Sequence, residues 1–457
     1  MKFTKFGKAL LMSALSAGVI LCVTSCVRSY TVGYLYVTGT VTAESNGSGI
    51  ISGYKIDHNT GFLTPINGMP ISSGGANPER AVLIVGSKFF YVLNAGVNAQ
   101  GGATCTTANP CQNSNITEFA VGGNGIMTPQ ETFYTQGINP FRMMADTSGN
   151  YLLVLDHDSP NNATCKLALG PLATTCGDIT VFQINQTTGR LTLVVNAQVT
   201  GSTGTGLTYF PVPANPIDFV LASGYVMTLS GLPPPAGTGD SVFPYVYSSG
   251  SGQLSLGQNS PQPITIGGNN QSATQATAIV SASGVIYVLD NEPVTYTPSG
   301  SSSPVTSPSQ IVPFTVGNNG ALQAQTGGVI PDATTVVNPI YLIVVSKTSN
   351  NFLYVANQGS NVLGVNAESG IAGYTITTSP SYQATPLTPP TFGSGAGPQC
   401  LVEDPSGQFI YTANFNDSTI TGRSIDVNDG VLNPLRVANS YTLQGQATWC
   451  LVDGRTD

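Results

Sequence analysis

The sequence is poor in charge. Only 8% of its 457 residues are charged, against about 25% in a typical soluble domain, so long solvated helices are not expected. Glycine and proline are abundant, with 53 and 31 residues, and this composition favours strands joined by turns. The length alone permits two or three ordinary domains or one large repetitive domain.

Positive charge is especially scarce. The chain has 14 Lys and Arg against 22 Asp and Glu. Three of the lysines lie in residues 1–25, which have the pattern of a removed segment, so the mature balance is 11 against 22, or −11. A nucleic-acid-binding protein needs a basic stripe. The sequence has none, which excludes that class of function.

Several catalytic and cofactor motifs are also absent. There is no glycine-rich phosphate loop with Lys and Ser/Thr, no paired-His helical motif and no nucleophile-elbow motif. The cluster Asp156-His157-Asp158 contains residue types that bind zinc or calcium, but no second ligand pair at fixed spacing accompanies it. A turn in which Asp156 caps the backbone is the simpler interpretation. We therefore predict neither a metal site nor a cofactor.

The N-terminus carries the pattern of an export signal. Three lysines in residues 1–8 precede the apolar stretch 9–23, which is short for a membrane-spanning helix. The stretch ends in Val-Thr-Ser-Cys, and a Cys directly after small residues resembles the bacterial lipobox. That resemblance implies a signal peptide at 1–25 and acylation of Cys26, whereas an ordinary cleaved signal peptide is the alternative. The predicted tether is 26–33.

Acylation would anchor the chain on a membrane, because two or more acyl chains hold a protein there stably. Val27, rather than Asp, follows Cys26, so we expect the outer membrane in a two-membrane bacterium. We expect a monomer.

Export also permits disulfides. Apart from Cys22 and Cys26, six cysteines remain, an even number. Two pairs bracket short loops and would each close one insertion, and the last two cysteines are then left for each other. Buried free thiols are the alternative in each case. The predicted pairs are Cys105 with Cys111, Cys165 with Cys176, and Cys400 with Cys450.

An internal repeat determines the fold prediction. Seven runs of aromatic and β-branched residues end in a polar residue or Gly and recur 55 to 74 residues apart, which is typical of buried strands that lead into turns. Asn-Pro or Gly-Pro and an apolar segment precede five of them, and a Gly turn follows in six repeats. The runs are YLYVTG at 34, FFYVLN at 89, YLLVLD at 151, YVMTLS at 225, VIYVLD at 285, FLYVAN at 352 and FIYTAN at 409.

Each unit thus has four strands in about 60 residues, and four-stranded units repeated radially form a β-propeller. We predict an all-β, seven-bladed propeller over 34–457. The first repeat lacks an inner strand, whereas the chain ends in QATWCLVDG, which matches GPQCLVED in the seventh. The C-terminal strand should therefore complete blade 1, with Cys400 and Cys450 at equivalent positions of adjacent inner strands. A β-helix would need shorter repeats, and two β-sandwiches would need none.

Long Ser/Thr/Gly/Pro tracts interrupt the repeat. They lie at 201–206, 231–240 and 294–309, and we interpret them as insertions that decorate one face.

The repeat resembles the lactonase-type seven-bladed propellers that carry the YVTN motif, a family that includes 6-phosphogluconolactonases. WD40 proteins are disfavoured because Trp-Asp endings are absent and the chain has one Trp. The resemblance implies a cationic pocket over the channel, with His and Arg near the starts of inner strands and a carboxylate close by. The matching positions, two after the Pro, are Arg80, Arg142, Asp218, Tyr341 and Cys400.

No His stands beside these residues. His157 follows a second strand and is the one His that we expect at the same end of the channel as Arg142, whereas His58 lies in a turn. In the lactonase hypothesis the two Arg bind the acid group, and His157 or Asp218 moves a proton. The Asn residues before Pro should satisfy loop backbone groups, although a ring of amides and Tyr341 could also bind sugar hydroxyls. These residues are Asn77, Asn139, Asn215 and Asn338.

Three functions follow as hypotheses. The first is a binding propeller of the cell envelope whose loop-rich mouth takes a small sugar acid, a polysaccharide or an envelope protein. The second is a lactone hydrolase acting outside the cytoplasm. The third is a structural module that pairs with other envelope proteins. The scarcity of Lys and Arg counts against a phosphate pocket, and therefore against the second hypothesis.

Overall fold

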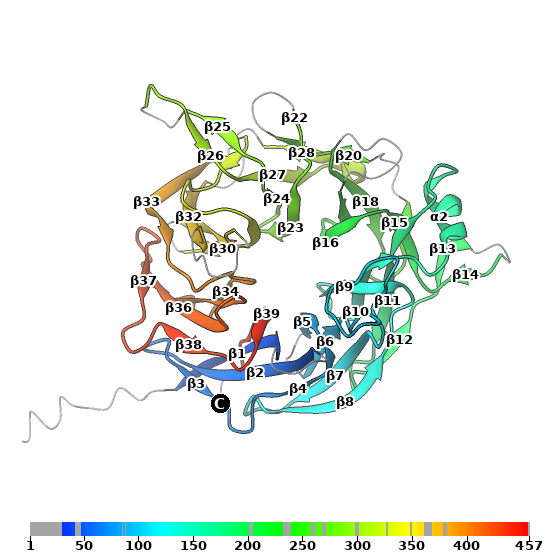
Figure 1. Cartoon of the computed structure of the whole chain (residues 1–457), viewed down its shortest axis with the longest axis horizontal. Helices are drawn as coiled ribbons and strands as arrows, with labels where there is room; N and C mark the ends of the chain where they lie inside the picture. The colour runs from blue at the N-terminus through cyan, green and yellow to red at the C-terminus, as the bar shows by residue number, and fades with distance from the viewer. Residues whose placement is uncertain are drawn as a thin grey trace, which may run out of the picture.

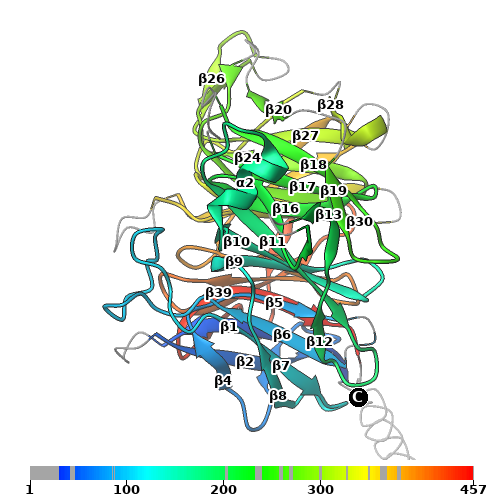
Figure 2. The same ribbon diagram turned by 90° about the vertical axis from the view of Figure 1, so that its right-hand side faces the viewer.

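The chain forms a ring of seven β-sheets around a central axis (Figures 1 and 2). Each sheet is one blade, with strands that are antiparallel to their neighbours. The computed structural model describes residues 30–41, 47–84, 86, 88–200, 204–231, 239–256, 261–266, 271–297, 301–325, 328–347, 350–360, 368–377 and 382–455. The prediction of a seven-bladed propeller with four-stranded blades is confirmed.

Each blade has an inner, a second, a third and an outer strand. From blade 1 to blade 7, the inner strands are β39 (Gln446–Asp453), β5 (Pro78–Leu83), β9 (Ile138–Ala145), β16 (Pro216–Ala222), β23 (Ala276–Ala282), β30 (Pro339–Ser346) and β34 (Val402–Glu403). In the same order, the second strands are β1 (Thr31–Thr40), β6 (Phe89–Asn94), β10 (Tyr151–Asp158), β17 (Tyr225–Ser230), β24 (Val285–Asp290), β31 (Asn351–Asn357) and β35 (Phe409–Asn414).

The third strands are β2 (Ser48–Asp57), β7 (Asn115–Val121), β11 (Cys176–Ile184), β18 (Ser241–Tyr247), β27 (Gln310–Val316), β32 (Gly370–Ile376) and β36 (Thr419–Ile425). The outer strands are β3 (Leu63–Pro65), β8 (Met127–Phe133), β12 (Leu191–Leu193), β19 (Leu254–Leu256), β28 (Leu322–Ala324), β33 (Ala384–Phe392) and β37 (Leu432–Pro434).

Short elements supplement this plan within the described ranges. A second outer segment pairs with the third strand in five blades: β4 (Ile71–Ala76), β15 (Phe210–Pro213), β20 (Gln262–Pro263), β29 (Ile330–Pro331) and β38 (Ser440–Thr442). Separate hairpins are formed by β13 (Asn196–Thr200) with β14 (Gly206–Leu207), β21 (Thr265–Ile266) with β22 (Gln271–Ser272), and β25 (Val294–Tyr296) with β26 (Val305–Ser307). The described helices are α2 (Asn162–Leu169) and the 3-10 turn η1 (Asn318–Gly320).

The seven runs found in the sequence are the seven second strands. Their continuous apolar character has a simple cause, because both faces of a blade are covered by neighbouring blades. In β6, Phe90 and Val92 pack against blade 1, whereas Tyr91 and Leu93 pack against blade 3. All four side chains are fully buried. The core of the protein is therefore a set of clusters between adjacent blades.

The Gly turns of the repeat are contacts between blades. Gly125, at the turn between β7 and β8, has a positive φ of 79°. A Cβ atom there would lie 2.6 Å from the ring of Tyr34, the aromatic residue that opens the run of blade 1. Six turns repeat this arrangement with the first aromatic residue of the neighbouring run: Gly61 with Phe409, Gly125 with Tyr34, Gly189 with Phe89, Gly252 with Tyr151, Gly320 with Tyr225 and Gly430 with Phe352.

Tyrosine hydroxyls add hydrogen bonds at the same contacts. Tyr36 donates to the Gly125 carbonyl at 2.8 Å, and Tyr411 donates to the Gly61 carbonyl at 2.6 Å. Between blades 5 and 6 the pattern changes on both sides. The run of blade 5 opens with Val285, and the repeat of blade 6 is the one in which the sequence shows no Gly turn. The aromatic residue and the glycine are thus lost together.

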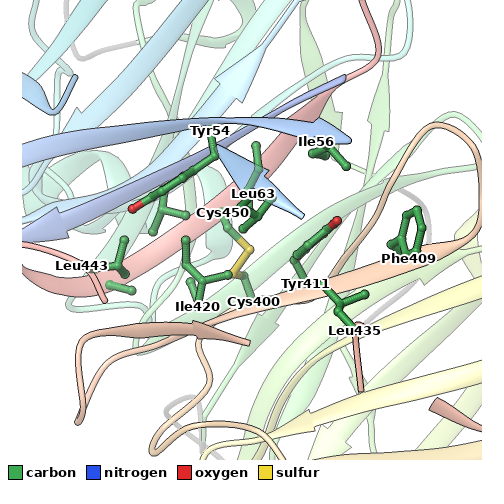
Figure 3. Close-up of a cluster of buried hydrophobic side chains, with 14 of the residues drawn as sticks. Tyr54, Ile56, Leu63, Cys400, Phe409, Tyr411, Ile420, Leu435, Leu443 and Cys450 are labelled. Carbon is green, nitrogen blue, oxygen red and sulfur yellow. A yellow bond between two sulfur atoms is a disulfide. The ribbon is translucent and has the colours of Figure 1, made fainter. Parts of the chain in front are cut away.

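The C-terminal strand closes the ring, as predicted. β39 pairs with β1 from Tyr34 opposite Asp453 to Thr40 opposite Gln446. Figure 3 shows the Cys400–Cys450 disulfide within the buried cluster between blades 7 and 1. A loop of 50 residues closed in this way restricts the unfolded chain by about 4 kcal/mol in the chain-entropy model.

All three predicted disulfides are present, with Cα atoms 5.2 to 5.8 Å apart. One detail of the prediction was wrong. Cys400 and Cys450 are not at equivalent ladder positions, because Cys450 lies opposite Val37, whereas Trp449 and not Cys450 occupies the level of Cys400. Since side chains alternate between the faces of a strand, this one-residue offset turns the two sulfur atoms toward each other.

Long connections gather at one end of the channel. The two short-loop disulfides and the hairpin β25–β26 all lie between second and third strands. The tracts at 231–240 and 294–309 occupy such connections, as predicted. The tract at 201–206 does not, because it joins β13 to β14 beside the outer strand of blade 3. Residues 201–203, 232–238 and 298–300 lie outside the described residues.

We expect Gly125→Ala to destabilise the protein more than Gly284→Ala. Both glycines have nearly the same positive φ, 79° and 78°, but nothing lies within 4 Å of a Cβ atom at Gly284. The conformational cost, about 1 kcal/mol, is therefore shared, and the clash with Tyr34 adds about 1–3 kcal/mol at Gly125. Urea unfolding of the two variants measures the difference. Equal losses would contradict the role assigned to the contact.

Candidate functional site

The Asn-Pro motif positions the start of the inner strand in blades 2, 3, 4 and 6. The four Asn residues have left-handed φ values of 50° to 63°, and Gly397 takes the same place in blade 7 with a φ of 68°. Asn and Gly are the residues that tolerate this conformation best. The carbonyls of Asn77, Asn215, Asn338 and Gly397 accept hydrogen bonds from the residue after the second strand, for example from Ala95 to Asn77 at 2.9 Å and from Phe415 to Gly397 at 2.8 Å.

The amide side chains are engaged by nearby loops. Asn77 donates to the Gly96 carbonyl at 2.7 Å, and Asn338 donates to Gln358 at 2.8 Å. Asn139 donates to Asp158 at 3.0 Å, and Asn215 donates to the Gly231 carbonyl at 3.3 Å. These contacts match the expectation that the Asn residues satisfy loop groups. Sugar binding by this ring stays a prediction, and it would require exchange of these hydrogen bonds.

A β-bulge after the Pro then sets the next position. In blades 2, 3, 4 and 6 the register shifts between the Pro and the residue two further on, and in blade 5 it shifts between Ala276 and Ala278. The bulge brings residues from all blades to one level of the channel, opposite the next-to-last residue of the run. In blades 1 to 7 these residues are Trp449, Arg80, Arg142, Asp218, Ala278, Tyr341 and Cys400.

Arg142 and Asp218 form an ion pair at this level. Nε of Arg142 lies 3.3 Å from Oδ1 of Asp218, and both side chains are largely buried. Asp218 also accepts backbone hydrogen bonds from Phe219 at 2.9 Å and from Ile279 of blade 5 at 3.3 Å. The carboxylate is thus held between blades 4 and 5 and fixes the guanidinium from blade 3.

Arg80 lies on an aromatic ring instead. Its guanidinium carbon is 4.1 Å from the centroid of Trp449, which also meets the ring of Tyr341 edge-on at 5.0 Å. Arg80 donates to the Glu79 carbonyl at 3.0 Å. Within the part of the chain that the structure describes, no carboxylate lies within 4.0 Å of this guanidinium. We call Arg80, Arg142, Asp218, Tyr341 and Trp449 the channel cluster.

Burial and neighbouring charge shift the pKa values of this region. Burial, with Arg142 close by, lowers the pKa of Arg80 to about 9, which still leaves it cationic at neutral pH. Burial raises the pKa of Glu79, although Arg142 and Arg80 oppose that shift. The pKa of Tyr341 is raised by burial, so its hydroxyl stays a hydrogen-bond donor. The region thus combines two cations with a carboxyl group that holds its proton more tightly than usual.

Among the described residues, His157 makes no hydrogen bond or ion pair with a member of the channel cluster. It lies two residues beyond Leu155, the ladder partner of Arg142, at the predicted end of the channel, but 43% of its side chain is exposed. Its Nδ1 lies 3.3 Å from Asp158, and its ring centroid lies 6.0 Å from that of Phe141. The Arg142 guanidinium also lies on the Phe141 ring. A proton-transfer role for His157 stays a prediction.

The sequence prediction missed Trp449 and Glu79. The shared Cys-Leu-Val of QATWCLVDG and GPQCLVED places Cys450 and not Trp449 at the channel level. Ala447 takes the place of the Pro in blade 1, with Thr448 in the bulge, and counting two residues on from Ala447 gives Trp449. Glu79 occupies the bulge position, where sequence spacing carries no signal about burial.

Asp156 is a buried link between strands, and its carboxyl group also accepts a hydrogen bond from the Gly137 backbone. It lies opposite Asp178 in the ladder of β10 and β11, and neither side chain is exposed. Burial raises the pKa of Asp156 to about 7, and burial together with the Asp156 charge raises that of Asp178 well above its usual value. Thr180 donates to both carboxyl groups. The pair therefore retains a proton well above the usual range of aspartate.

The pair should make stability fall as pH rises. Between about pH 4 and pH 7 the folded pair keeps protons that the unfolded chain has released, so the free energy of unfolding decreases over that range. Asp178→Asn replaces the shared proton with an amide donor, so we expect the free energy of unfolding to decrease less with pH in this variant than in the wild-type protein. Urea unfolding of both proteins at pH 4.5 and 7.5 measures the two decreases. Asp290 and Asp332, whose pKa values are also raised, act equally in both proteins, so an unchanged slope would contradict the assignment.

Solved structures share this fold. A Pseudomonas aeruginosa periplasmic gluconolactonase is 16% identical, with a TM-score of 0.58, and the match covers 92% of this chain and 99% of that one. A Bacteroides fragilis protein provisionally named as a 6-phosphogluconolactonase is 14% identical, with a TM-score of 0.59 and coverage of 92% and 98%. A similarly named Bacteroides uniformis protein is 13% identical, with a TM-score of 0.58 and coverage of 92% and 99%.

At these identities the likeness establishes the lactonase-like propeller fold. No family model and no curated protein matches the sequence. Among the described residues, no group of three or more His, Cys, Asp or Glu side chains could hold a metal ion, and no helix has the length and apolar character needed to cross a membrane. The predicted signal peptide and Cys26 lie outside the described residues.

Proposed function

We propose that this propeller binds a small carboxylate ligand, such as a sugar acid, at the channel cluster. The observation that carries the proposal is the position of Arg80, which lies on Trp449 with no described carboxylate within 4.0 Å. A guanidinium in such surroundings favours a carboxylate ligand, because charge-assisted hydrogen bonds to Arg are strong and bidentate. Burial strengthens that interaction further.

The other members of the cluster suit the rest of such a ligand. The rings of Trp449 and Tyr341 meet edge-on and offer apolar surface for the face of a sugar ring, as aromatic side chains with a polar handle do. Asp218 is already neutralised by Arg142, so it does not repel an anion as a lone carboxylate would. Its oxygens can accept hydrogen bonds from hydroxyl groups. The channel cluster is therefore suited to one negative charge beside several hydroxyls.

We expect gluconate to bind the protein and Arg80→Met to weaken that binding about tenfold or more, the loss that one charge-assisted contact accounts for. Arg190→Met is the matched control, because Arg190 lies in a turn with 68% of its side chain exposed. Titration calorimetry measures affinity, and the emission of Trp449, the only tryptophan, reports occupancy. Equal affinity in Arg80→Met, or no binding of any sugar acid, would overturn the proposal.

Lactone hydrolysis is the second candidate. Two observations favour it: the named activity of the structural neighbours, and a carboxyl group with a raised pKa, Glu79, beside two arginines. In this mechanism an Arg polarises the lactone carbonyl. Glu79 takes a proton from a water molecule while the oxygen of that water adds to the carbonyl carbon. The ring C–O bond then breaks, and the leaving ring oxygen takes the proton from Glu79 to give the hydroxy acid. A base with a raised pKa suits this step near neutral pH.

Glu79→Gln tests the enzyme hypothesis separately from binding. If the protein hydrolyses glucono-lactone or related aldonolactones, the variant should lose kcat while it still binds gluconate, because Gln keeps the shape and loses the basic oxygen. The wild-type rate should rise as pH increases through the pKa of Glu79. Absence of turnover in the wild-type protein on a panel of aldonolactones would exclude this candidate and leave the binding proposal standing.

We also propose that the protein is exported and anchored by acylation of Cys26, in the outer membrane of a two-membrane bacterium. The lipobox-like segment and the three disulfides support this location, because disulfides persist in oxidising compartments. A polysaccharide or envelope protein at the loop-rich mouth is a further proposed ligand class.

A further inference from the structure

The two ends of the propeller carry different parts of the chain: the long connections lie at one end, and the chain enters β1 at the other. The first described residue, Tyr30, precedes β1 and lies at the end opposite the long connections. Its ring stacks on His58 at 4.4 Å, and its carbonyl accepts a hydrogen bond from the His58 amide at 3.0 Å. The strand itself starts at Thr31, so the propeller includes residues that precede the predicted boundary at 34. This contact fixes where the chain leaves the propeller.

The distance to the acylated residue is therefore short. Cys26 precedes Tyr30 by four residues, and four extended residues span at most about 14 Å. The channel cluster lies far from this point, because its member Trp449 pairs with Thr38. Thr38 lies eight residues beyond Tyr30 along β1. Eight strand residues correspond to about 26 Å. An anchor at Cys26 thus holds one end of the propeller at the membrane and keeps the cluster away from it.

Apolar side chains are exposed at both ends, because the opposite end exposes Leu167 and Leu172, to 59% and 67%; those of the Tyr30 end lie around the point where the chain enters the first strand. Tyr30 is 51% exposed, and the adjacent blades 2 and 7 expose Ile126 and Val427 in their turns, to 39% and 54%. The same turns of blades 3, 4 and 5 expose threonine, serine and asparagine. The turn of blade 7 also exposes Asp429, which indicates contact at the level of the lipid headgroups rather than insertion among acyl chains.

We propose that the protein stands on a phospholipid surface with the Tyr30 end against the headgroups, so that the mouth carrying the long connections opens away from the bilayer. This inference rests on the proposed anchor at Cys26. It follows that the channel cluster receives ligand from the aqueous compartment at that mouth and not from the membrane.

Brominated phospholipids test the orientation, because bromine quenches tryptophan only at short range. The full acylated chain is purified from membranes and reconstituted in vesicles with and without the brominated lipid. We expect no loss of emission from native Trp449. In a Trp449→Phe background, Tyr30→Trp should lose emission. Leu172→Trp, a matched reporter that is 67% exposed in the connection before β11, should not. Quenching of the Leu172 reporter but not the Tyr30 reporter would overturn the orientation.

The anchor has its own control. Palmitate labelling should mark the wild-type chain and not Cys26→Ser, and the Cys26→Ser form of the Tyr30→Trp reporter should escape quenching. An unlabelled wild-type chain would overturn the inference through its anchor. That outcome leaves the gluconate titration unaffected, so failure of the orientation and failure of the proposed ligand remain distinguishable.

Discussion

The contact between a glycine of one blade and an aromatic ring of the next holds the ring of blades in register. A blade is apolar on both faces, so burial alone would permit it to slide against its neighbour. Gly125 accepts the ring of Tyr34 where any side chain would clash, and Tyr36 donates to the same turn. Shape and a directional hydrogen bond together set the register between blades. Where Val285 replaces the aromatic residue, the neighbouring repeat shows no Gly turn in its sequence.

Closure of the ring and assembly of the channel cluster use the same strand. β39 pairs with β1, and its residues Trp449 and Cys450 have opposite tasks because adjacent side chains point to opposite faces. Trp449 meets Arg80 and Tyr341 in the channel, whereas Cys450 joins Cys400 between the blades. The cluster therefore contains no aromatic platform for Arg80 until the last strand of the chain has docked.

Much of this architecture could be predicted because it depends on local repetition. The runs, the Gly turns and the Asn-Pro motifs each report a backbone requirement: burial on two faces, a positive φ, or a left-handed start to a strand. Arg80, Arg142, Asp218 and Tyr341 could be named for the same reason, since a constant offset from Pro places them at one level. Trp449 escaped because Ala447 replaces the Pro from which the offset is counted, and the shared Cys-Leu-Val aligns Cys450 with Cys400 instead.

The number of blades, the closure by the C-terminal segment and the pairing of six cysteines follow from the amino-acid pattern alone, because each depends on a repeat or on the count of partners that remain. The contacts across the channel do not. The ion pair of Arg142 with Asp218 and the stacking of Arg80 on Trp449 join residues from different blades, and His157 lies outside the cluster although its position along the chain matched the prediction. These distances depend on how the blades are rotated around the axis, and no local pattern encodes that rotation.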